Sequence, residues 1–337
     1  TKLEQKLLKT TEDMNIKVEG AGVATESGFT SLGKYQEIAA PSGFINTDGK
    51  PLVLADYIGK KIILIDFMTY SCINCIRTFP YLVDWNTKYA DKGLLIVGIH
   101  TPEFAFEKKL ENVEKALKEY GITFPILLDN DYGTWNAYKN QYWPRKFIID
   151  LRGNIDYDHI GEGKYEETEE VIQKLLKTIS GNANLSVEKK VNDVNLMPTK
   201  GISSEAYLGY GRIEYHVTPI KNECQDTLCQ YVTASSIPEN RFSFGGKWTL
   251  DSENALGETG STITFNAVAK KVHLVAGSLD ELSTATVEVY VDGILTKTIT
   301  IKESDLYTLV DGTEKKNQKV MIKVISGKLL GYAYTFG

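Results

Sequence analysis

The stretch "DFMTYSCINCIRTFP", residues 66–80, decides the fold because it joins the end of an apolar run to a Cys-x-x-Cys pair. The run "KIILIDFM", residues 61–68, is short and rich in isoleucine, which predicts a buried strand. We expect a helix from about residue 72 to 90. Cysteines at positions i and i+3 share one helix face, so their sulfurs can reach bonding distance. The stretch therefore predicts a dithiol, Cys72 and Cys75, where a strand meets a helix.

The two cysteines are expected to have different roles. Free N–H groups and the helix dipole favour negative charge at the start of a helix, where known thiols have pKa values of roughly 3.5–7.5. Cys72 is thus the expected nucleophile, and Cys75 the resolving thiol. Half of a zinc site would need a second Cys or His pair nearby, and none follows. An inert disulfide across so short a loop would add little stability.

Length and composition limit the other possibilities. The chain has 337 residues, enough for two domains, and its 42% apolar and 24% charged residues are ordinary for a globular protein. A net charge of −6 and the lack of a basic, aromatic-rich cluster argue against nucleic acid as a partner. No apolar run is long enough to cross a membrane. Because the numbering opens on Thr1, we expect a targeting or membrane segment upstream in the complete protein.

The pattern changes along the chain predict four parts. Residues 1–40 are a lead-in segment, and residues 41–181 alternate strands with helices before a final hairpin and helix, which predicts an α/β layer. Within it, "GFINTDGKPLVL", residues 43–54, has an Asp-Gly step that predicts a hairpin. Residues 182–202 are polar and form a predicted linker. Residues 203–337 contain short alternating runs typical of an all-β sandwich or jelly roll.

Several motifs carry a family resemblance. Asp66 stands six residues before Cys72 and Pro80 eight after it, and with "YWPRKFIID" these offsets resemble thioredoxin-fold proteins. The stretches "FMTYSCINCIRTFPYL" and "GIHTPEF" are similar to the extracytoplasmic TlpA/ResA-like branch, and above all to the C-terminal region of DipZ-type cytochrome c biogenesis proteins. The resemblance continues through "SEAYLGYGR", "GGKWTLDSENA" and "GYAYTFG". It implies an α/β thioredoxin fold followed by an all-β jelly-roll sandwich similar to carbohydrate-binding modules.

The resemblance also implies roles for residues around the dithiol. Pro144 would be the cis-proline that faces the two sulfurs, since X-Pro bonds adopt the cis form at low cost. Trp143 would offer its backbone to the bound substrate chain. Asp66 would accept the proton of Cys75, with a purely structural carboxylate as the alternative.

Three further residues near the dithiol are candidates. Glu103 falls where some relatives carry an active-site carboxylate, and a solvated Glu at a helix start is the alternative. Ile73 and Asn74, between the cysteines, are expected to contact substrate and help set the redox poise.

A second cysteine pair lies in a polar insert of the β region. Cys224 and Cys229 are five residues apart, which predicts a local structural disulfide in an exported protein. A metal site with His216 would lack a fourth ligand. A second redox site would lack the strand–helix setting that activates a thiol.

The β region could bind carbohydrate through aromatic side chains, because aromatic faces stack on sugars. The candidate platforms are Tyr207, Tyr210, Trp248, Tyr307 and Tyr332. The alternative is that they fill the core of the sandwich, as alternating strands require.

The predicted function is an extracytoplasmic thiol–disulfide oxidoreductase that reduces disulfides of exported proteins, apocytochrome c among them. Thiol exchange needs no metal or organic cofactor, because the Cys72–Cys75 disulfide itself carries the electrons. The resemblance implies a membrane electron donor of CcdA/DsbD type and a membrane tether.

Two alternatives stay open. A thiol peroxidase is suggested by Thr69 three residues before Cys72, although Ile65 stands where peroxiredoxins have proline. The other is a glycan-binding surface protein in which the thioredoxin-like layer is only a scaffold.

Overall fold

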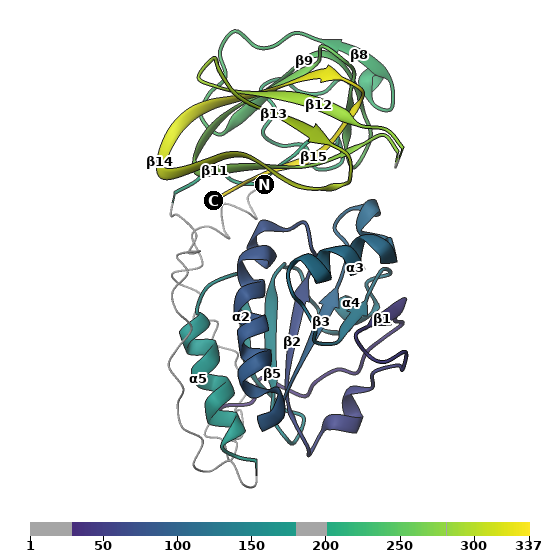
Figure 1. Ribbon diagram of the computed structural model, residues 1–337, viewed down its shortest axis with the longest axis vertical. Helices are drawn as coiled ribbons and strands as arrows, with labels where there is room; N and C mark the ends of the chain where they lie inside the picture. Colours follow the sequence, from purple (N-terminus) through teal and green to yellow (C-terminus); the bar gives the residue numbers. More distant parts are fainter. Residues whose placement is uncertain (1–28, 180–200, 281) are drawn as a thin grey trace.

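The computed structural model describes residues 29–179, 201–280 and 282–337, which form an α/β domain and an all-β domain stacked end to end (Figure 1). Both predicted layers are therefore present, in the predicted order. Most of the expected lead-in segment (1–40) and linker (182–202) lies outside the described residues. The described end of the lead-in pairs with the α/β domain, since Lys34 bridges to Asn154.

The α/β domain is built on one six-stranded sheet in the order β1-β4-β3-β2-β5-β6. Strands β2, β3 and β4 are parallel, and β1, β5 and β6 run antiparallel to their neighbours. The elements are β1 Gly43–Ile45, η1 Leu54–Tyr57, β2 Ile62–Met68, α2 Ile73–Tyr89, η2 Ala90–Lys92, β3 Leu94–His100, η3 Ala105–Lys108, α3 Leu110–Glu119, β4 Ile126–Leu128, α4 Gly133–Ala137, β5 Arg145–Ile149, β6 Ile155–Ile160 and α5 Tyr165–Leu176.

Strand β2 is buried along its whole length because both faces of the sheet are covered. Its side chains alternate between two apolar clusters. Leu64 packs in the cluster that contains Phe79 of α2, and Ile65 packs in the cluster that contains Trp135 of α4. The same alternation places Asp66 on the face covered by α2, which carries the two cysteines.

The predicted hairpin at residues 43–54 is wrong in its second arm. Gly43–Ile45 does form a strand, but it pairs with β4. The Asp-Gly step turns the chain as expected, with Lys50 N bonded to Thr47 O. Beyond Pro51, whose ring nitrogen cannot donate to a sheet ladder, the chain buries Leu54 in a 3-10 turn of the core.

The all-β domain is a sandwich that closes on itself. Strand β11 pairs with β14, β15 and β9, while β9 returns to β15 through β10. The two longest strands, β11 and β14, carry bulges that allow them to bend between layers. The elements are β7 Ala206–Tyr207, η4 Asn222–Cys224, β8 Leu228–Tyr231, β9 Arg241–Leu250, β10 Ala255–Gly257, β11 Thr262–Ser278, β12 Ala285–Val291, β13 Ile294–Ile301, β14 Asp305–Ser326 and β15 Leu329–Phe336.

The two domains share an apolar junction. Val275 and Ala333 of the β sandwich are buried in the cluster that also contains the core of the α/β domain. Tyr332 packs its ring against Phe104 and Phe106, with centroids 5.2 and 4.8 Å apart. Because these two phenylalanines follow the carboxyl end of β3, the β domain lies against the sheet end where the cysteines are expected.

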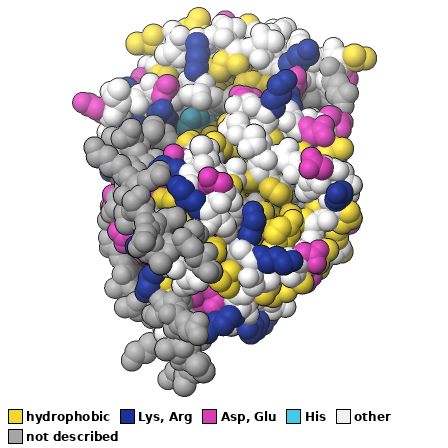
Figure 2. All heavy atoms as spheres, turned by 60° about the horizontal axis from the view of Figure 1, so that its bottom comes forward, with side chains coloured by type: hydrophobic (Ala, Val, Ile, Leu, Met, Phe, Trp, Pro, Cys, Tyr) yellow, Lys and Arg dark blue, Asp and Glu magenta, His cyan; other side chains and the backbone are white. Residues whose placement is uncertain are grey.

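Two further features concern the distribution of surface charge and the character of the helices. On the face seen in Figure 2, basic and acidic side chains are interspersed, so this face offers no large field of one sign for steering a charged partner. Among the described residues, no helix combines the length and the apolar character needed to span a bilayer.

Candidate functional site

Cys72 and Cys75 occupy the first turn of α2. Cys72 is the residue that caps the helix start, with extended backbone angles, and Cys75 lies one turn along. Both thiols are free in this structure. Cys72 is half-buried, whereas Cys75 is fully buried. Of the two cysteines, Cys72 alone has surface exposed to a partner molecule, as expected of a nucleophile with a resolving thiol behind it.

The buried thiol is held in its protonated form. Burial raises the pKa of Cys75 well above its ordinary value. The hydrogen bond with Cys72, and the negative charges of Cys72 and Asp66, raise the pKa of Cys75 further. Cys75 thus keeps its proton while Cys72 is free, and it needs a nearby base before it can attack.

Asp66 can supply that base, because it lies fully buried on the α2 face of β2. Neither carboxylate oxygen has a hydrogen-bond partner among the described residues. Burial raises the pKa of Asp66 from 3.8 to about 7, against the attraction of the Lys146 ammonium. A carboxyl group with such a pKa takes up or releases a proton near neutral pH.

Lys146 is a site residue that sequence reasoning missed. It is fully buried, its Nζ lies 3.9 Å from Asp66 Oδ1, and it donates to Gly161 O at 3.3 Å. Burial lowers the pKa of Lys146, and the charge of Asp66 opposes this effect. The signal was a lysine inside the apolar strand "KFIID", directly across the β2–β5 ladder from Asp66. A charge at such a position requires a buried partner.

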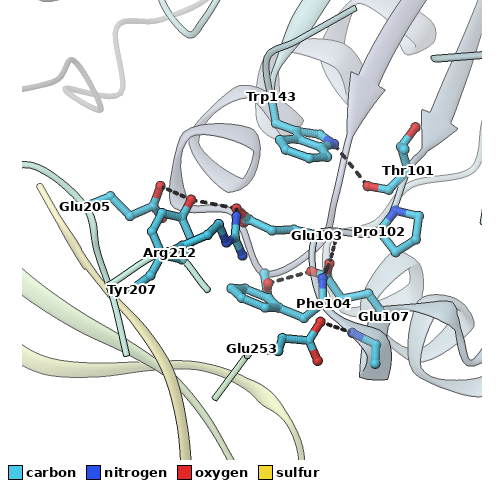
Figure 3. A network of polar contacts seen from close by, with 12 residues as sticks. Thr101, Pro102, Glu103, Phe104, Glu107, Trp143, Glu205, Tyr207, Arg212 and Glu253 are labelled. Atoms are coloured by element: carbon cyan, nitrogen blue, oxygen red, sulfur yellow. Dashed lines mark hydrogen bonds and ion pairs between the residues drawn. The ribbon is translucent and has the colours of Figure 1, made fainter. Parts of the chain in front are cut away.

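The peptide bond between Trp143 and Pro144 is cis. Strand β5 begins at the next residue, Arg145, which is paired with Phe67. The register therefore places Pro144 at the carboxyl end of β2, beside the loop that leads to Cys72. The Trp143 indole donates to Thr101 O at 3.0 Å, as Figure 3 shows. The contact of its backbone with a substrate stays a prediction.

The two residues between the cysteines differ in exposure. Ile73 is buried, with 9% of its surface exposed. Asn74 is half-buried, and its Oδ1 accepts a hydrogen bond from Arg77 at 2.6 Å. Arg77 in turn pairs with both carboxylate oxygens of Glu162 at 2.7 Å. Asn74 thus presents more surface to a partner molecule, and the substrate contact of both residues stays a prediction.

Glu103 lies in the turn that follows β3, and its carboxylate turns to the β domain. Its Oε1 accepts hydrogen bonds from Tyr207 Oη at 2.6 Å and Arg212 Nη1 at 2.9 Å. The carboxylate that turns inward from the same segment is that of Glu107, which accepts from Ser71 Oγ, the residue before Cys72, at 2.6 Å. Burial, with a smaller contribution from the charge of Glu103, raises the pKa of Glu107 to about 7. The direct redox role of Glu103 stays a prediction.

Cys224 and Cys229 form a disulfide with an S–S length of 2.02 Å. Their sulfurs are therefore not available to a metal together with His216, whose ring contacts Thr218 O and the Phe244 N–H. In residues 29–179, 201–280 and 282–337, no three His, Cys, Asp or Glu side chains are grouped as metal ligands.

Two of the candidate sugar platforms are wrong. Trp248 is completely buried in the sandwich core and donates to Gly245 O, so neither ring face is open. Tyr332 is covered by Phe104 and Phe106 at the domain junction. The remaining tyrosine candidates are half-buried, and their sugar binding stays a prediction.

Comparison with known families divides the chain at the same place as the structure. Residues 36–176 match the family described as Redoxin, and residues 203–337 match the family described as thioredoxin-like C-terminal domain. Protein DipZ of Mycobacterium tuberculosis and of Mycobacterium bovis is 36% identical over 255 residues. That alignment covers 75% of this chain and 36% of DipZ, so the chain spans about a third of the length of these relatives.

Shorter relatives match the first domain. Thiol-disulfide oxidoreductase ResA of Bacillus cereus is 29% identical over 158 residues, which cover 46% of this chain and 87% of ResA. Among solved structures, the thioredoxin domain of a thiol-disulfide oxidoreductase from Bacteroides vulgatus is 24% identical. The superposition covers 42% of this chain and 99% of the Bacteroides vulgatus domain, with a TM-score of 0.35.

Proposed function

We propose that the first domain of this chain, which matches the Redoxin family and is similar to thiol-disulfide oxidoreductase ResA, reduces disulfides of exported proteins through Cys72 and Cys75. The observation that carries the proposal is the asymmetry of the pair. Cys72 is partly exposed at the start of α2, and Cys75 is buried on the side of Asp66. A reachable nucleophile and a shielded second thiol are what two-step disulfide exchange requires.

In the first step, the Cys72 thiolate attacks one sulfur of the substrate disulfide. The substrate S–S bond breaks, its other sulfur leaves as a thiolate and takes a proton, and a mixed disulfide with Cys72 remains. In the second step, Cys75 transfers its proton to Asp66 and attacks the Cys72 sulfur. The second substrate sulfur leaves as a thiolate and takes a proton, two electrons have passed to the substrate, and Cys72 and Cys75 are joined in a disulfide.

The environment of Asp66 supports its part in the second step. A carboxylate without hydrogen bonds is more basic than one in water, and its pKa of about 7 suits proton uptake near neutral pH. Lys146 keeps that carboxylate from becoming too basic to ionise. The Asp66 carboxylate, paired with Lys146, can therefore accept a proton near neutral pH and lies close to the buried Cys75 thiol.

Location and partners form the second part of the proposal. The protein works outside the cytoplasm, tethered to the membrane, with a membrane electron donor of CcdA/DsbD type that reduces the Cys72–Cys75 disulfide. Apocytochrome c is one substrate. The structural disulfide Cys224–Cys229 supports this location, because such bonds persist in oxidising compartments. The greater length of DipZ supports the presence of further segments.

The test is to trap the mixed disulfide. A Cys75→Ser variant cannot resolve the first intermediate, so substrates stay bound to Cys72 and can be identified by mass spectrometry after expression in the native host. The matched control is the Cys72→Ser/Cys75→Ser double variant. Exported proteins with cysteine pairs on the single variant alone would support the proposal. Equal recovery on both variants, or capture of cytoplasmic proteins only, would contradict it.

A further inference from the structure

The β domain contacts the turn beside the dithiol through Arg212. The Arg212 guanidinium lies 3.7 Å from the centre of the Tyr207 ring, and its Nη1 is 2.9 Å from Glu103 Oε1. Tyr207 donates to the same oxygen at 2.6 Å. In Figure 3 both side chains point from the β domain at the Glu103 carboxylate. The Glu103 side chain is only 7% exposed, and Arg212 forms an ion pair with it.

Two more contacts hold the same turn from the same side. Glu253 of the β domain accepts a hydrogen bond from Ala105 N at 2.9 Å. Phe104 and Phe106 pack against Tyr332. Four successive residues of the α/β domain, from 103 to 106, are thus fixed by side chains from another domain. An isolated thioredoxin-like domain would leave this turn exposed.

The inner side of the turn leads directly to the cysteines. Glu107 Oε2 accepts hydrogen bonds from Glu103 N at 2.5 Å and from Phe104 N at 2.9 Å. Glu107 Oε1 accepts from Ser71 Oγ at 2.6 Å, and Ser71 is the residue before Cys72. The contacts therefore form one continuous path from Arg212 through Glu103, the turn and Glu107 to the nucleophile's neighbour.

We propose that Arg212 is a positioning residue for Cys72: by fixing Glu103 it holds the turn that directs Glu107 at Ser71, so that the β domain is part of the redox site. This inference rests on the proposed thiol exchange. The Arg212 side chain is itself 41% exposed, but the links behind it, from the Glu103 carboxylate to Ser71, are short hydrogen bonds between buried or half-buried groups. Such a link has little freedom to relax when one member is removed. Loss of the Arg212 contact lets the turn move and releases Ser71, and Cys72 reacts more slowly with disulfides.

The experiment uses the full chain in a Cys75→Ser background, which isolates the first step. The second-order rate of Cys72 with 5,5′-dithiobis(2-nitrobenzoate) is compared for Arg212→Gln, Glu103→Gln and the double variant. We expect each single variant to slow the reaction by about fivefold, the lower end of usual couplings between sites. The double variant should react no more slowly than either single variant, because each of the three variants breaks the same path from Arg212 to Ser71. Arg212→Lys, which keeps the charge, should recover part of the rate.

The control is Arg152→Gln, which removes an exposed arginine paired with Asp150 in the turn between β5 and β6. It should react at the parent rate. If the parent itself does not react, the proposed function fails. If the parent reacts but Arg212→Gln and Glu103→Gln match it, or if only one of them is slow, the positioning role of Arg212 fails. If Arg212→Gln does not fold, Glu103→Gln alone decides between these outcomes.

Discussion

Replacing Asp66 with Asn should stabilise the protein at neutral and alkaline pH. The asparagine amide has the shape of a protonated carboxyl group but cannot ionise, so it removes the cost of a buried negative charge. Asp66 is fully buried, and its oxygens have no hydrogen-bond partner among the described residues. Its folded-state pKa is about 7, compared with 3.8 for an unperturbed group.

The pKa values give the size and the sign of the effect. Between pH 3.8 and 7 the folded protein keeps a proton on Asp66 that the unfolded chain has released. Because the folded state binds more protons there, the stability of the parent falls as pH rises through this window. At 1.36 kcal/mol per pKa unit, the penalty is about 2 kcal/mol at pH 5 and about 4 kcal/mol at pH 8. The attraction of Lys146 is already part of the pKa of about 7.

The assay is urea unfolding of the parent and Asp66→Asn at pH 5 and pH 8 in the presence of reductant. Tryptophan fluorescence reports mainly on the α/β domain, which contains Trp85, Trp135 and Trp143. The stability gain should rise by about two- to threefold between pH 5 and pH 8. In a trapping assay, resolution of the mixed disulfide should slow by about 100-fold, the lower end of general-base contributions. A gain independent of pH, or a loss of stability at pH 8, would refute the reasoning.

Three other substitutions test separate parts of the structure. Lys146→Met removes the cation beside Asp66 and should raise the pKa of Asp66 further. The pH profile of mixed-disulfide resolution should then move to higher pH, and an unshifted profile would contradict the pairing. Replacing Cys224 and Cys229 with Ala should lower the free energy of unfolding by about 2 kcal/mol, measured in urea, with insulin reduction unchanged. If the Cys224/Cys229 variant instead lost its insulin-reducing activity, this bridge would itself be redox-active. Trp248→Ala should lower the stability of the β domain by about 3–5 kcal/mol, as for other buried aromatics, measured by urea unfolding followed by circular dichroism. A change near zero in the free energy of unfolding would contradict the burial of Trp248 in the sandwich core.

The local part of the site could be predicted from the sequence. Strand β2 is an apolar run interrupted only by Asp66, and the period of two along it places Asp66 on the face that α2 covers. Helix α2 begins at Ile73 with Cys72 as its cap, as the Cys-x-x-Cys pattern indicated. These features depend on residues close together in the chain, where propensity and pattern are informative.

The parts that the sequence could not supply depend on contacts between distant residues. Glu103 and Glu107 are four residues apart, and both could have faced the cysteines. Arg212 and Tyr207, more than 100 residues away, draw Glu103 outward and leave Glu107 inside. Trp248 stands in an alternating strand whose inner face is set by how the sandwich closes. No local pattern carries either piece of information.

The central claim is that Cys72 and Cys75 exchange two electrons as a pair, and a glutathione redox titration tests it most directly. Protein equilibrated in a series of reduced and oxidised glutathione ratios is quenched with acid, alkylated and analysed by peptide mass spectrometry. We predict one transition in which Cys72 and Cys75 lose both thiols together, while the Cys224–Cys229 bridge stays oxidised across the range. Thiols that remain free at every ratio, or a Cys72–glutathione adduct that accumulates without loss of the Cys75 thiol, would contradict the account.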